Sequence, residues 1–247
     1  MNSILITGCN RGLGLGLVKA LVKLPKPPQH LFATCRNKDQ AKELQDLAAE
    51  HPCIHIIEID LNNFEAYDDL VKQIDDTTQG CGLNVLFNNA AIAYNEPNLD
   101  AVKADQMMNT FKTNSVVPVM LTIACLPLIK KASEANNSLE MGLERAAIIN
   151  MSSSLGSIST NTTGGFFTYR CSKAALNAAT KSFSIELLPD KILCVALHPG
   201  WVRTEMGGPN APMEINCTTE EIVNTVMKFN KSHHGGFYQH DGVNLPW

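Results

Sequence analysis

The hydrophobic residues of this chain fall into short, nearly uninterrupted runs, separated by longer stretches in which apolar residues recur at helical spacing. Runs rich in β-branched and aliphatic residues predict strands, and because successive positions are apolar, both faces of each strand should be covered. The predicted strands are residues 4–7, 31–35, 54–59, 85–88, 147–151, 192–197 and, near the C-terminus, 237–240.

The stretches between these runs predict helices whose ends are marked by prolines or caps. Pro25 ends the first helix, Pro52 follows the second, and Pro189 follows the last but one. The sequence Thr218-Thr-Glu-Glu221 has the pattern of a capping box and predicts the start of the final helix. The predicted helices are 12–24, 39–50, 64–77, 102–131, 169–188 and 218–226.

Strands that alternate with helices predict βαβ units and a parallel sheet. The irregular stretches 94–100, 133–145, 157–167 and 204–217 are too short to be domains, and we expect them to be loops. A length of 247 residues fits one α/β core. We therefore expect a single domain over 1–247 with a doubly wound parallel sheet.

Composition narrows the range of partners. The formal net charge is −4 and no long basic run occurs, which argues against nucleic acid or a membrane as a partner. The first residues lack the charged and apolar regions of a signal peptide, and no run of about 18 uncharged apolar residues occurs. Scattered cysteines and histidines predict neither a disulfide framework nor a metal site. We expect a soluble, cytoplasmic protein that binds a small molecule.

A glycine-rich turn follows the first strand and opens the first helix: Thr7-Gly8-Cys9-Asn10-Arg11-Gly12-Leu13-Gly14. Glycines let the backbone approach a pyrophosphate closely, and the free N–H groups at a helix N-terminus attract its charge. The alternative is a turn that only packs the helix on the strand. Its position between a strand and a helix favours a dinucleotide site.

The end of the second strand indicates which dinucleotide binds. An NAD site usually places an acidic residue there, whereas an arginine suits the 2′-phosphate of NADP. Here the strand is followed by Arg36, and the first acidic residue is Asp39. Arg11 could add a second guanidinium to the same phosphate. The sequence therefore predicts NADPH or NADP+.

The candidate chemistry lies in Tyr169-Arg-Cys-Ser-Lys173 and in three serines upstream. Residues four apart share one helix face, so the ammonium of Lys173 should lie near the phenol of Tyr169 and lower its pKa. A phenol tuned in this way can act as a general acid. Among the serines, the strand period of two places Ser152 and Ser154 on the face opposite Ser153.

In their order along the chain these motifs resemble those of the short-chain dehydrogenase/reductase family. The resemblance runs from the first strand to near the C-terminus, and segments 4–14, 147–153 and 198–202 are similar to carbonyl reductases of the insect sniffer type. It implies a Rossmann-like fold with strand order 3-2-1-4-5-6-7.

The resemblance also implies roles for individual residues. Tyr169 would be the proton donor, and Lys173 would bond the nicotinamide ribose and lower the phenol's pKa. Ser153 would polarise the substrate carbonyl, with its two neighbouring serines as alternatives, and Asn114 would hold a water in the proton path. Further cofactor contacts are implied for Asp60, Leu61, Asn88, Asn89, Ala90, Pro199, Gly200, Val202, Thr204 and Met206.

Two departures from the family pattern concern the surroundings of the site. Ala91 stands where the family often has glycine, so its backbone must avoid strained φ values. Residues 162–165 look like an insertion, which affects the shape of the substrate pocket.

Two further expectations follow from single residues. Pro118 cannot bond the carbonyl of Asn114, so the predicted helix should kink there and leave that carbonyl free. Cys9, Cys35 and Cys171 lie beside cationic residues, which could favour thiolates open to oxidation, although inert packing is the alternative.

The activity implied is reduction of an aldehyde, ketone or quinone carbonyl in a small-molecule substrate by NADPH. The alternatives are an NADP-dependent alcohol or steroid dehydrogenase and a dinucleotide-sensing interaction protein, and the complete catalytic set argues against the second. Family members often pair through their fifth and sixth helices, so a homodimer or homotetramer is open, as is a monomer.

Overall fold

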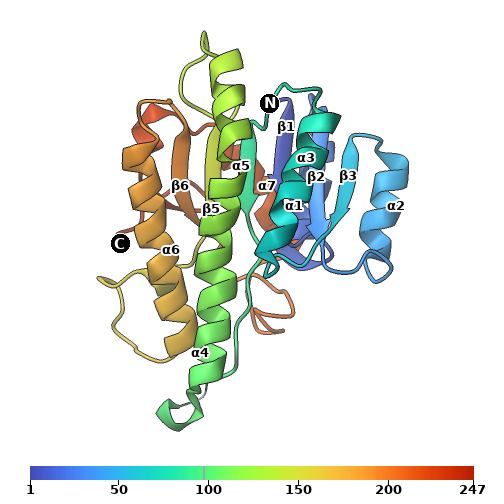
Figure 1. Ribbon diagram of the computed structural model, residues 1–247. Coiled ribbons are helices and arrows are strands. Elements are labelled where there is room, and N and C mark those ends of the chain that lie inside the picture. The colour runs from blue at the N-terminus through green and yellow to red at the C-terminus, as the bar shows by residue number, and fades with distance from the viewer. Residues whose placement is uncertain (97) are drawn as a thin grey trace.

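The computed structural model describes residues 1–96 and 98–247, and these form a seven-stranded sheet in the order β3-β2-β1-β4-β5-β6-β7 (Figure 1). Every neighbouring pair of strands is parallel. The predicted fold class and strand order are confirmed. The strands are β1 Ser3–Ile6, β2 His30–Cys35, β3 Ile54–Glu58, β4 Val85–Asn88, β5 Ala147–Met151, β6 Leu193–His198 and β7 Phe237–Gln239.

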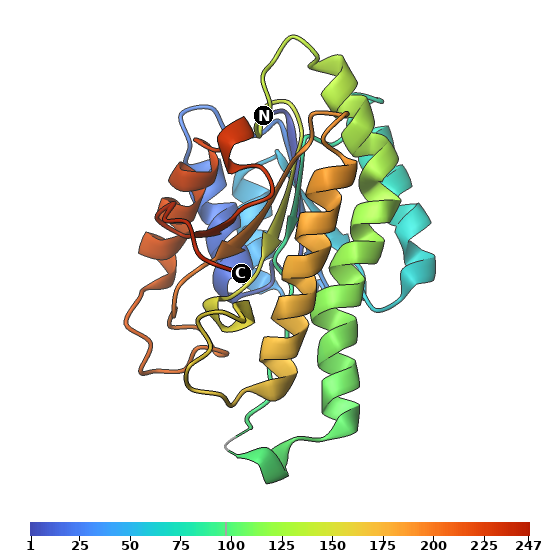
Figure 2. The same cartoon turned by 90° about the vertical axis from the view of Figure 1, so that its left-hand side faces the viewer.

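Helices cover both faces of the sheet, as Figure 2 shows along its edge. Alternate strand residues point to opposite faces, so Ile4 and Ile6 belong to one buried cluster and Leu5 to the other. The first cluster is covered by α1 Gly12–Val22, α2 Lys42–Glu50 and α7 Ile215–Val226; the second by α3 Tyr67–Thr77, α5 Val117–Ala135 and α6 Phe167–Glu186. This two-sided burial explains why the strands are apolar at successive positions.

The predicted helix 102–131 is a composite of three segments. It consists of α4 Ala104–Phe111, a π-helical turn η3 Lys112–Val116 and α5, preceded by the short 3₁₀ turn η2 Leu99–Ala101. In the π turn the amide of Val117 bonds the carbonyl of Lys112, five residues back. Pro118, in the first turn of α5, lacks an amide for the carbonyl of Asn114. The helix therefore contains a π turn directly before this proline, and the predicted kink at Pro118 stays a prediction.

The predicted start of the last helix is wrong. Helix α7 begins at Ile215, after Glu214, and the hydroxyl of Thr218 bonds the carbonyl of Glu214 at 2.8 Å from inside the first turn. The side chain of the N-cap residue does not cap this helix end, so the Thr218-Thr-Glu-Glu221 pattern does not act as a capping box, and α7 packs on α1 from its earlier start. Helix α2 likewise begins at Lys42 and not at 39, and several strand ends shift by one residue.

The helical column Ala104–Ala135 is long and apolar enough to cross a membrane by length and composition alone, with a mean hydropathy of 1.6 in its most apolar stretch. Half of that stretch is buried. Val117, Leu121 and Cys125 pack in the cluster beneath β4 and β5. Packing on the sheet therefore accounts for the buried half of this apolar stretch.

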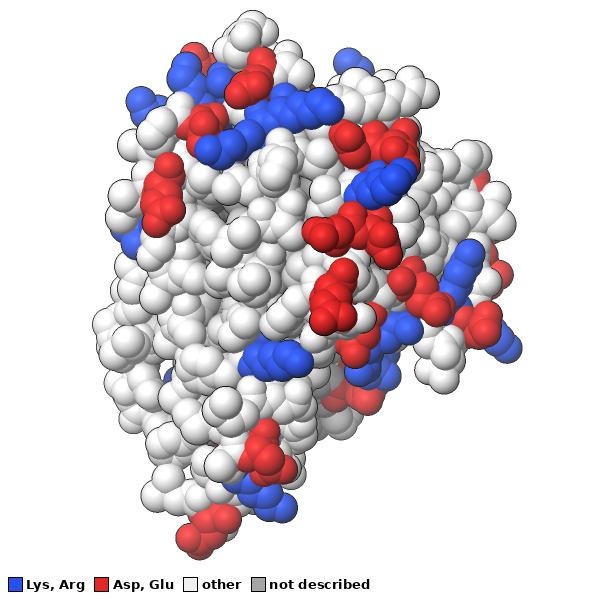
Figure 3. All heavy atoms as spheres, viewed as in Figure 1, with Lys and Arg blue, Asp and Glu red and all other residues white. Residues whose placement is uncertain are grey.

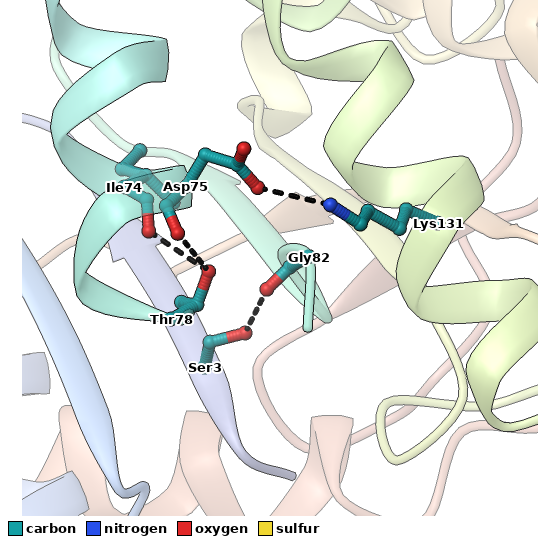
Figure 4. Close-up of polar contacts among 6 residues, drawn as sticks. All are labelled: Ser3, Ile74, Asp75, Thr78, Gly82 and Lys131. Atoms are coloured by element: carbon teal, nitrogen blue, oxygen red, sulfur yellow. Dashed lines mark hydrogen bonds and ion pairs between the residues drawn. The ribbon is translucent and has the colours of Figure 1, made fainter. Parts of the chain in front are cut away.

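Polar side chains join the connections at the amino edge of the sheet (Figure 4). The hydroxyl of Ser3 donates to the carbonyl of Gly82 at 3.0 Å, the ammonium of Lys131 bonds Asp75 at 3.3 Å, and the hydroxyl of Thr78 bonds back into the end of α3. Gly82 has φ +81°, and a Cβ there would lie 2.4 Å from a backbone carbonyl of α5. The turn between α3 and β4 is thereby fixed on β1 and α5.

A buried polar network continues along this edge, which we call the amino-edge network and define by Ser3, Asn84, Ser133 and Arg145. The amide oxygen of Asn84 accepts from the backbone N–H and the hydroxyl of Ser3, and its NH2 group donates to the carbonyl of Arg145 at 3.1 Å. The guanidinium of Arg145 donates to Ser133 at 2.9 Å. These groups link β1, β4, α5 and β5.

Candidate active site

The predicted site residues gather at the carboxyl edge of the sheet, at the lower end of Figure 1. Loops after β4, β5 and β6 converge there, together with the turn after β1. In parallel α/β sheets ligands bind at this edge, because strand ends and helix N-termini meet there.

The glycine turn has the backbone that a phosphate site needs. Gly8 and Gly12 have φ values of +71° and +59°, and a Cβ on Gly14 would lie 2.1 Å from the carbonyl oxygen of Gly8. Arg11 is the N-cap of α1, and none of the described residues caps this helix end through a side chain. The first amides of α1 therefore face an open turn with the positive end of the helix dipole.

Side chains hold this turn in place from below. The hydroxyl of Thr7 accepts from the amides of both Asn89 and Ala90 at 2.9 Å, and the amide group of Asn89 donates to the carbonyl of Thr7 at 2.8 Å. The amide of Gly8 donates to the hydroxyl of Thr34 at 3.1 Å. Thr7 and Thr34 were not assigned such a role from the sequence, because only the pairing of β1 with β2 and β4 brings these groups together.

Asn88 and Asn89 have different surroundings although they are adjacent. The side chain of Asn88 is buried and donates to Asn150 at 2.8 Å and to Thr122 at 3.3 Å, so it lies in the interior, and only its backbone remains for the predicted ribose contact. Strand alternation turns it away from the turn that Asn89 holds.

The implied adenine contacts also divide into exposed and buried residues. Asp60 is exposed and bonds the amide of Asn62 at 3.0 Å, whereas Leu61 is buried and its carbonyl accepts from Tyr67 at 2.6 Å. Only the first of the two presents a polar side chain at the surface.

The two predicted phosphate-binding arginines are both exposed. Arg36 follows β2 directly, at the carboxyl edge. Arg11 forms an ion pair with Glu205 at 2.6 Å, which links the glycine turn to the loop after β6. Asn10 is also exposed and Leu13 is partly buried, so this side of the turn is accessible.

Ser153 and Tyr169 are neighbours at the base of the site. Tyr169 is partly buried; desolvation raises the pKa of its phenol to about 12, and the nearby hydroxyl of Ser153 acts in the opposite direction. The hydroxyl of Ser152 points elsewhere and bonds Asn177 at 2.5 Å. Ser154 begins the short turn η4 Ser154–Gly156. Of the three serines, Ser153 is the one whose hydroxyl influences the pKa of the phenol.

Lys173 lies on the same helix face as Tyr169 but does not lower its pKa as expected. Its ammonium donates to the carbonyl of Met151 at 2.7 Å and lies 5.6 Å from the centre of the tyrosine ring. Burial lowers the pKa of Lys173 to about 7. A lysine that loses its charge near neutral pH exerts little electrostatic pull, so desolvation decides the pKa of both groups.

Asn114 fastens the loop after β4 to α6. Its amide oxygen accepts from the backbone N–H of Ile92 at 2.8 Å, and its NH2 group donates to the carbonyl of Ile92 at 2.8 Å and to the hydroxyl of Ser172 at 3.1 Å. Its side chain is fully buried. Its partner Ser172 lies three residues after Tyr169 in α6, so Asn114 contacts α6 about one turn from the phenol-bearing residue.

The segment after β6 returns to the glycine turn. Gly200 has φ +85°, and a Cβ there would lie 2.4 Å from the sulfur of Met213. Val202 is buried and bridges to Met213, while Thr204 lies beside Gly12. The remaining residues of the segment are the partly buried Pro199 and the half-exposed Met206 and Trp201.

The inserted loop is tied to the residue that follows Tyr169. The guanidinium of Arg170 donates to the carbonyls of Gly164 and Gly165 at 3.2 and 3.0 Å and to the hydroxyl of Thr163 at 2.9 Å. Both glycines have positive φ, near +65°, so the loop turns back over the helix end. Sequence reasoning did not single out Arg170.

Two expectations about local chemistry have clear outcomes. Non-glycine residues with left-handed backbone are, among the described residues, Gln79, Phe166 and Lys191, so Ala91 avoids this strain. Burial raises the pKa of Cys9 and Cys35, so the predicted thiolates are wrong for these two and inert packing fits them better.

Comparison with known proteins identifies the family. A family model described as short chain dehydrogenase matches residues 2–215, and the chain belongs to this family. It is similar to the carbonyl reductase Sniffer of D. melanogaster, with 61% identity, full coverage of both chains and a TM-score of 0.99. It is also similar to an NADPH-bound carbonyl reductase from chicken fatty liver, with 36% identity, 100% and 99% coverage and a TM-score of 0.94. The C-signal of Myxococcus xanthus is 36% identical over 67% of this chain and 93% of that protein.

The residues present fit a nicotinamide dinucleotide. A side chain on Gly14 would fill the turn, the amides at the start of α1 point toward it, and exposed arginine follows β2 where a 2′-phosphate would lie. The Ser153–Tyr169 pair stands at the far end of the same edge.

Proposed function

We propose that the chain is an NADPH-dependent carbonyl reductase in which Tyr169 gives a proton to the carbonyl oxygen of a small aldehyde, ketone or quinone. The placing of Tyr169 and Lys173 on one face of α6, with the ammonium 5.6 Å from the centre of the tyrosine ring at the edge that begins with the glycine turn, is the observation that carries the proposal. Two similar structures are carbonyl reductases, one of them described as NADPH-bound.

Bound NADPH would supply the hydride. The glycine turn would hold its pyrophosphate and Arg36 its 2′-phosphate, with Arg11 beside them. The other proposed contacts are Gly8, Asn10, Gly12, Leu13, Gly14, Asp60, Leu61, Asn89, Ala90, Tyr169, Lys173, Pro199, Gly200, Val202, Thr204 and Met206. Asn88 would contact the cofactor only through its backbone, since its side chain is buried.

Different side chains of the site would bond the substrate oxygen, donate the proton and pass it on. Two hydroxyl groups, those of Ser153 and Tyr169, can bond the same substrate oxygen and stabilise the negative charge that develops there. The phenol of Tyr169, with a pKa of about 12, is protonated at neutral pH and available as a donor, although burial makes it a weaker acid than an ordinary phenol. Lys173, with a pKa near 7, can pass a proton onward, and Asn114 fixes the helix turn behind it.

Steady-state turnover with a panel of dicarbonyls and quinones tests the activity. We expect NADPH consumption that depends on the carbonyl compound. A dinucleotide-sensing protein would bind NADPH without consuming it, and an alcohol or steroid dehydrogenase would oxidise an alcohol with NADP+ faster than it reduces any carbonyl in the panel.

The cofactor preference has its own test. Arg36→Asp should lower kcat/KM for NADPH by on the order of 10-fold or more, because an arginine–phosphate pair becomes a repulsive one. Lys38→Asp makes the same charge change two residues away and serves as the control, with little expected effect. Equal kcat/KM for NADH and NADPH in the unmodified enzyme would show the assignment of Arg36 to be wrong.

We further propose that the 247 residues form one soluble catalytic domain. We propose that two or four copies of the chain associate through α5 and α6. Location in the cytoplasm stays a prediction. The face of these helices toward the viewer in Figure 3 carries few charges. Ile123 of α5 and Ile185 of α6 are 50% and 65% exposed. An Ile123→Glu, Ile185→Glu double variant should lower the mass measured by light scattering from that of a dimer or tetramer to that of a monomer. An unchanged mass would remove this face as the interface.

A further inference from the structure

Glu96 is a buried carboxylate near the site that the reaction as described above does not use. It lies in the connection between β4 and α4 and is only 6% exposed. One oxygen, Oε2, accepts from the backbone N–H of Thr168 at 3.1 Å. The other, Oε1, is buried without a hydrogen-bond partner among the described residues.

The start of α6 explains why a carboxylate is held there. Thr168 is the second residue of α6, so its amide is one of those that no carbonyl within the helix can satisfy. The N-cap, Phe166, has left-handed backbone at φ +49° and provides no side-chain cap. Glu96 provides that cap from a distant segment, at the positive end of the helix dipole.

This bond is the second of two that fasten the connection after β4 to α6. At one end of the segment, the side chain of Asn114 makes two hydrogen bonds with the backbone of Ile92 and one with Ser172 of α6. At the other end, Glu96 bonds Thr168, the residue directly before Tyr169. The turn of α6 that carries the phenol is therefore held on both sides by one short segment.

We propose that Glu96 is a positioning residue for the proton-donating step: its carboxylate fixes the first turn of α6 and thereby aligns the phenol of Tyr169 with Ser153. The inference rests on the proposed function. Burial of an unsatisfied carboxylate oxygen is costly for stability, as is the buried hydroxyl of Thr168, which has no partner within the described chain. Costly polar groups of this kind persist where they serve a site.

The experiment compares Glu96→Ala with Glu96→Gln. The glutamine amide oxygen can accept from the same N–H, whereas alanine leaves the helix end without a cap. Misalignment of reacting groups is expensive in rate, so Glu96→Ala should lose kcat by on the order of 10-fold or more, with KM for NADPH changed less than about twofold. The solvent deuterium isotope effect on kcat should rise, because proton delivery becomes slower. Glu96→Gln should restore kcat to within about threefold of the unmodified enzyme.

The matched control removes a cap far from the site. Asn230 caps the short turn η5 Lys231–His233, where its side chain accepts from the amide of Ser232 at 2.9 Å. Asn230→Ala should lower Tm without changing kcat or the isotope effect. If Glu96→Ala keeps kcat within twofold, or loses kcat with an unchanged isotope effect, the positioning role is overturned.

Two further measurements keep the inference testable by itself. If Glu96→Ala does not fold, Glu96→Asp replaces it: the shorter carboxylate should lose kcat while Glu96→Gln keeps it, and the reverse order overturns the proposal. Amide hydrogen exchange at Thr168 needs no substrate, and it should accelerate in Glu96→Ala but not in Asn230→Ala. Unmodified protein that turns over no carbonyl would contradict the proposed function, whereas unchanged exchange at Thr168 would contradict the cap.

Discussion

The two edges of the sheet differ in how they treat buried polar groups. At the amino edge, the buried side chains of Asn84 and Arg145 have hydrogen-bond partners in β1, in α5 and in the segment before β5. At the carboxyl edge, buried atoms of Glu96, Thr168 and His198 have no partner among residues 1–96 and 98–247. The satisfied network stabilises the fold, and the unsatisfied atoms cost stability where the proposed chemistry takes place.

Several ionisable groups at the carboxyl edge have strongly shifted pKa values. At the carboxyl edge burial raises the pKa of Tyr169 to about 12 and lowers the pKa of Lys173 to about 7, and burial together with His240 lowers that of His198 to about 4. Shifts of this size mark groups that are buried away from water, where the charged form of each group is disfavoured. Substitutions at the two edges should therefore have opposite consequences for activity and stability.

The largest effect should come from Tyr169→Phe at the carboxyl edge. The ring remains and the proton donor is lost, so kcat should fall by about 10²-fold or more, while NADPH binding and Tm stay near their original values. Steady-state kinetics and a fluorescence titration with NADPH measure both. A variant with near-native kcat would remove Tyr169 from the proposed chemistry.

At the amino edge, Asn84→Ala should act on stability and not on turnover. The change leaves the amide of Ser3 and the carbonyl of Arg145 without their partner, which should cost about 2–4 kcal/mol in the free energy of unfolding. Urea denaturation measures this, and kcat at 25 °C should be unchanged for the folded fraction. Asn224→Ala, at an exposed position of α7, is the control. A large loss of kcat in Asn84→Ala would break the distinction between the edges.

Lys173→Met should abolish turnover yet raise stability at neutral pH by about 1–2 kcal/mol, because a buried amine is replaced by an apolar chain. The folded pKa near 7 lies below the ordinary 10.5, so between these values the unfolded chain binds a proton that the folded protein does not. Stability of the unmodified protein should therefore rise with pH from 7 toward 10.

The variant should lose this rise, and its gain in stability should be largest below pH 7. Tyr169 and the buried cysteines have raised pKa values that make stability fall at high pH, but they do so in both proteins. The difference in urea stability between Lys173→Met and the unmodified protein from pH 6 to 9.5 therefore isolates the lysine. Lys131→Met, at an exposed position, should leave the pH dependence as it is. If the stability of Lys173→Met still rises with pH, the rise must be assigned to a group other than Lys173.

The smallest effect compares two buried threonines of α6. Thr168→Val removes a hydroxyl without a described partner and should raise stability by up to about 1 kcal/mol. Thr180→Val removes a hydroxyl that accepts from Asn150 at 2.8 Å and donates to a backbone carbonyl, and it should lower stability by about 1–2 kcal/mol. Equal losses of Tm in both variants would mean that the Thr168 hydroxyl does have a partner.

The sequence by itself determined the layered fold and the order of its elements. Apolar runs can be stable only as covered strands, and the glycines at 8, 12 and 14 permit a backbone that other residues would block. The tyrosine–lysine spacing of four residues placed both groups on one helix face, because the helix repeats every 3.6 residues. These features depend on local stereochemistry, which a short stretch of sequence contains.

Only the tertiary structure decided which polar groups are buried and with what. The inward turn of Asn88, the early start of α7, the pKa of Lys173 and the cap that Glu96 provides to α6 all depend on segments far apart in the chain. Desolvation is the sum of everything packed around a group, and a hydrogen bond between residues 96 and 168 exists only after the sheet has formed. No spacing along the chain encodes either.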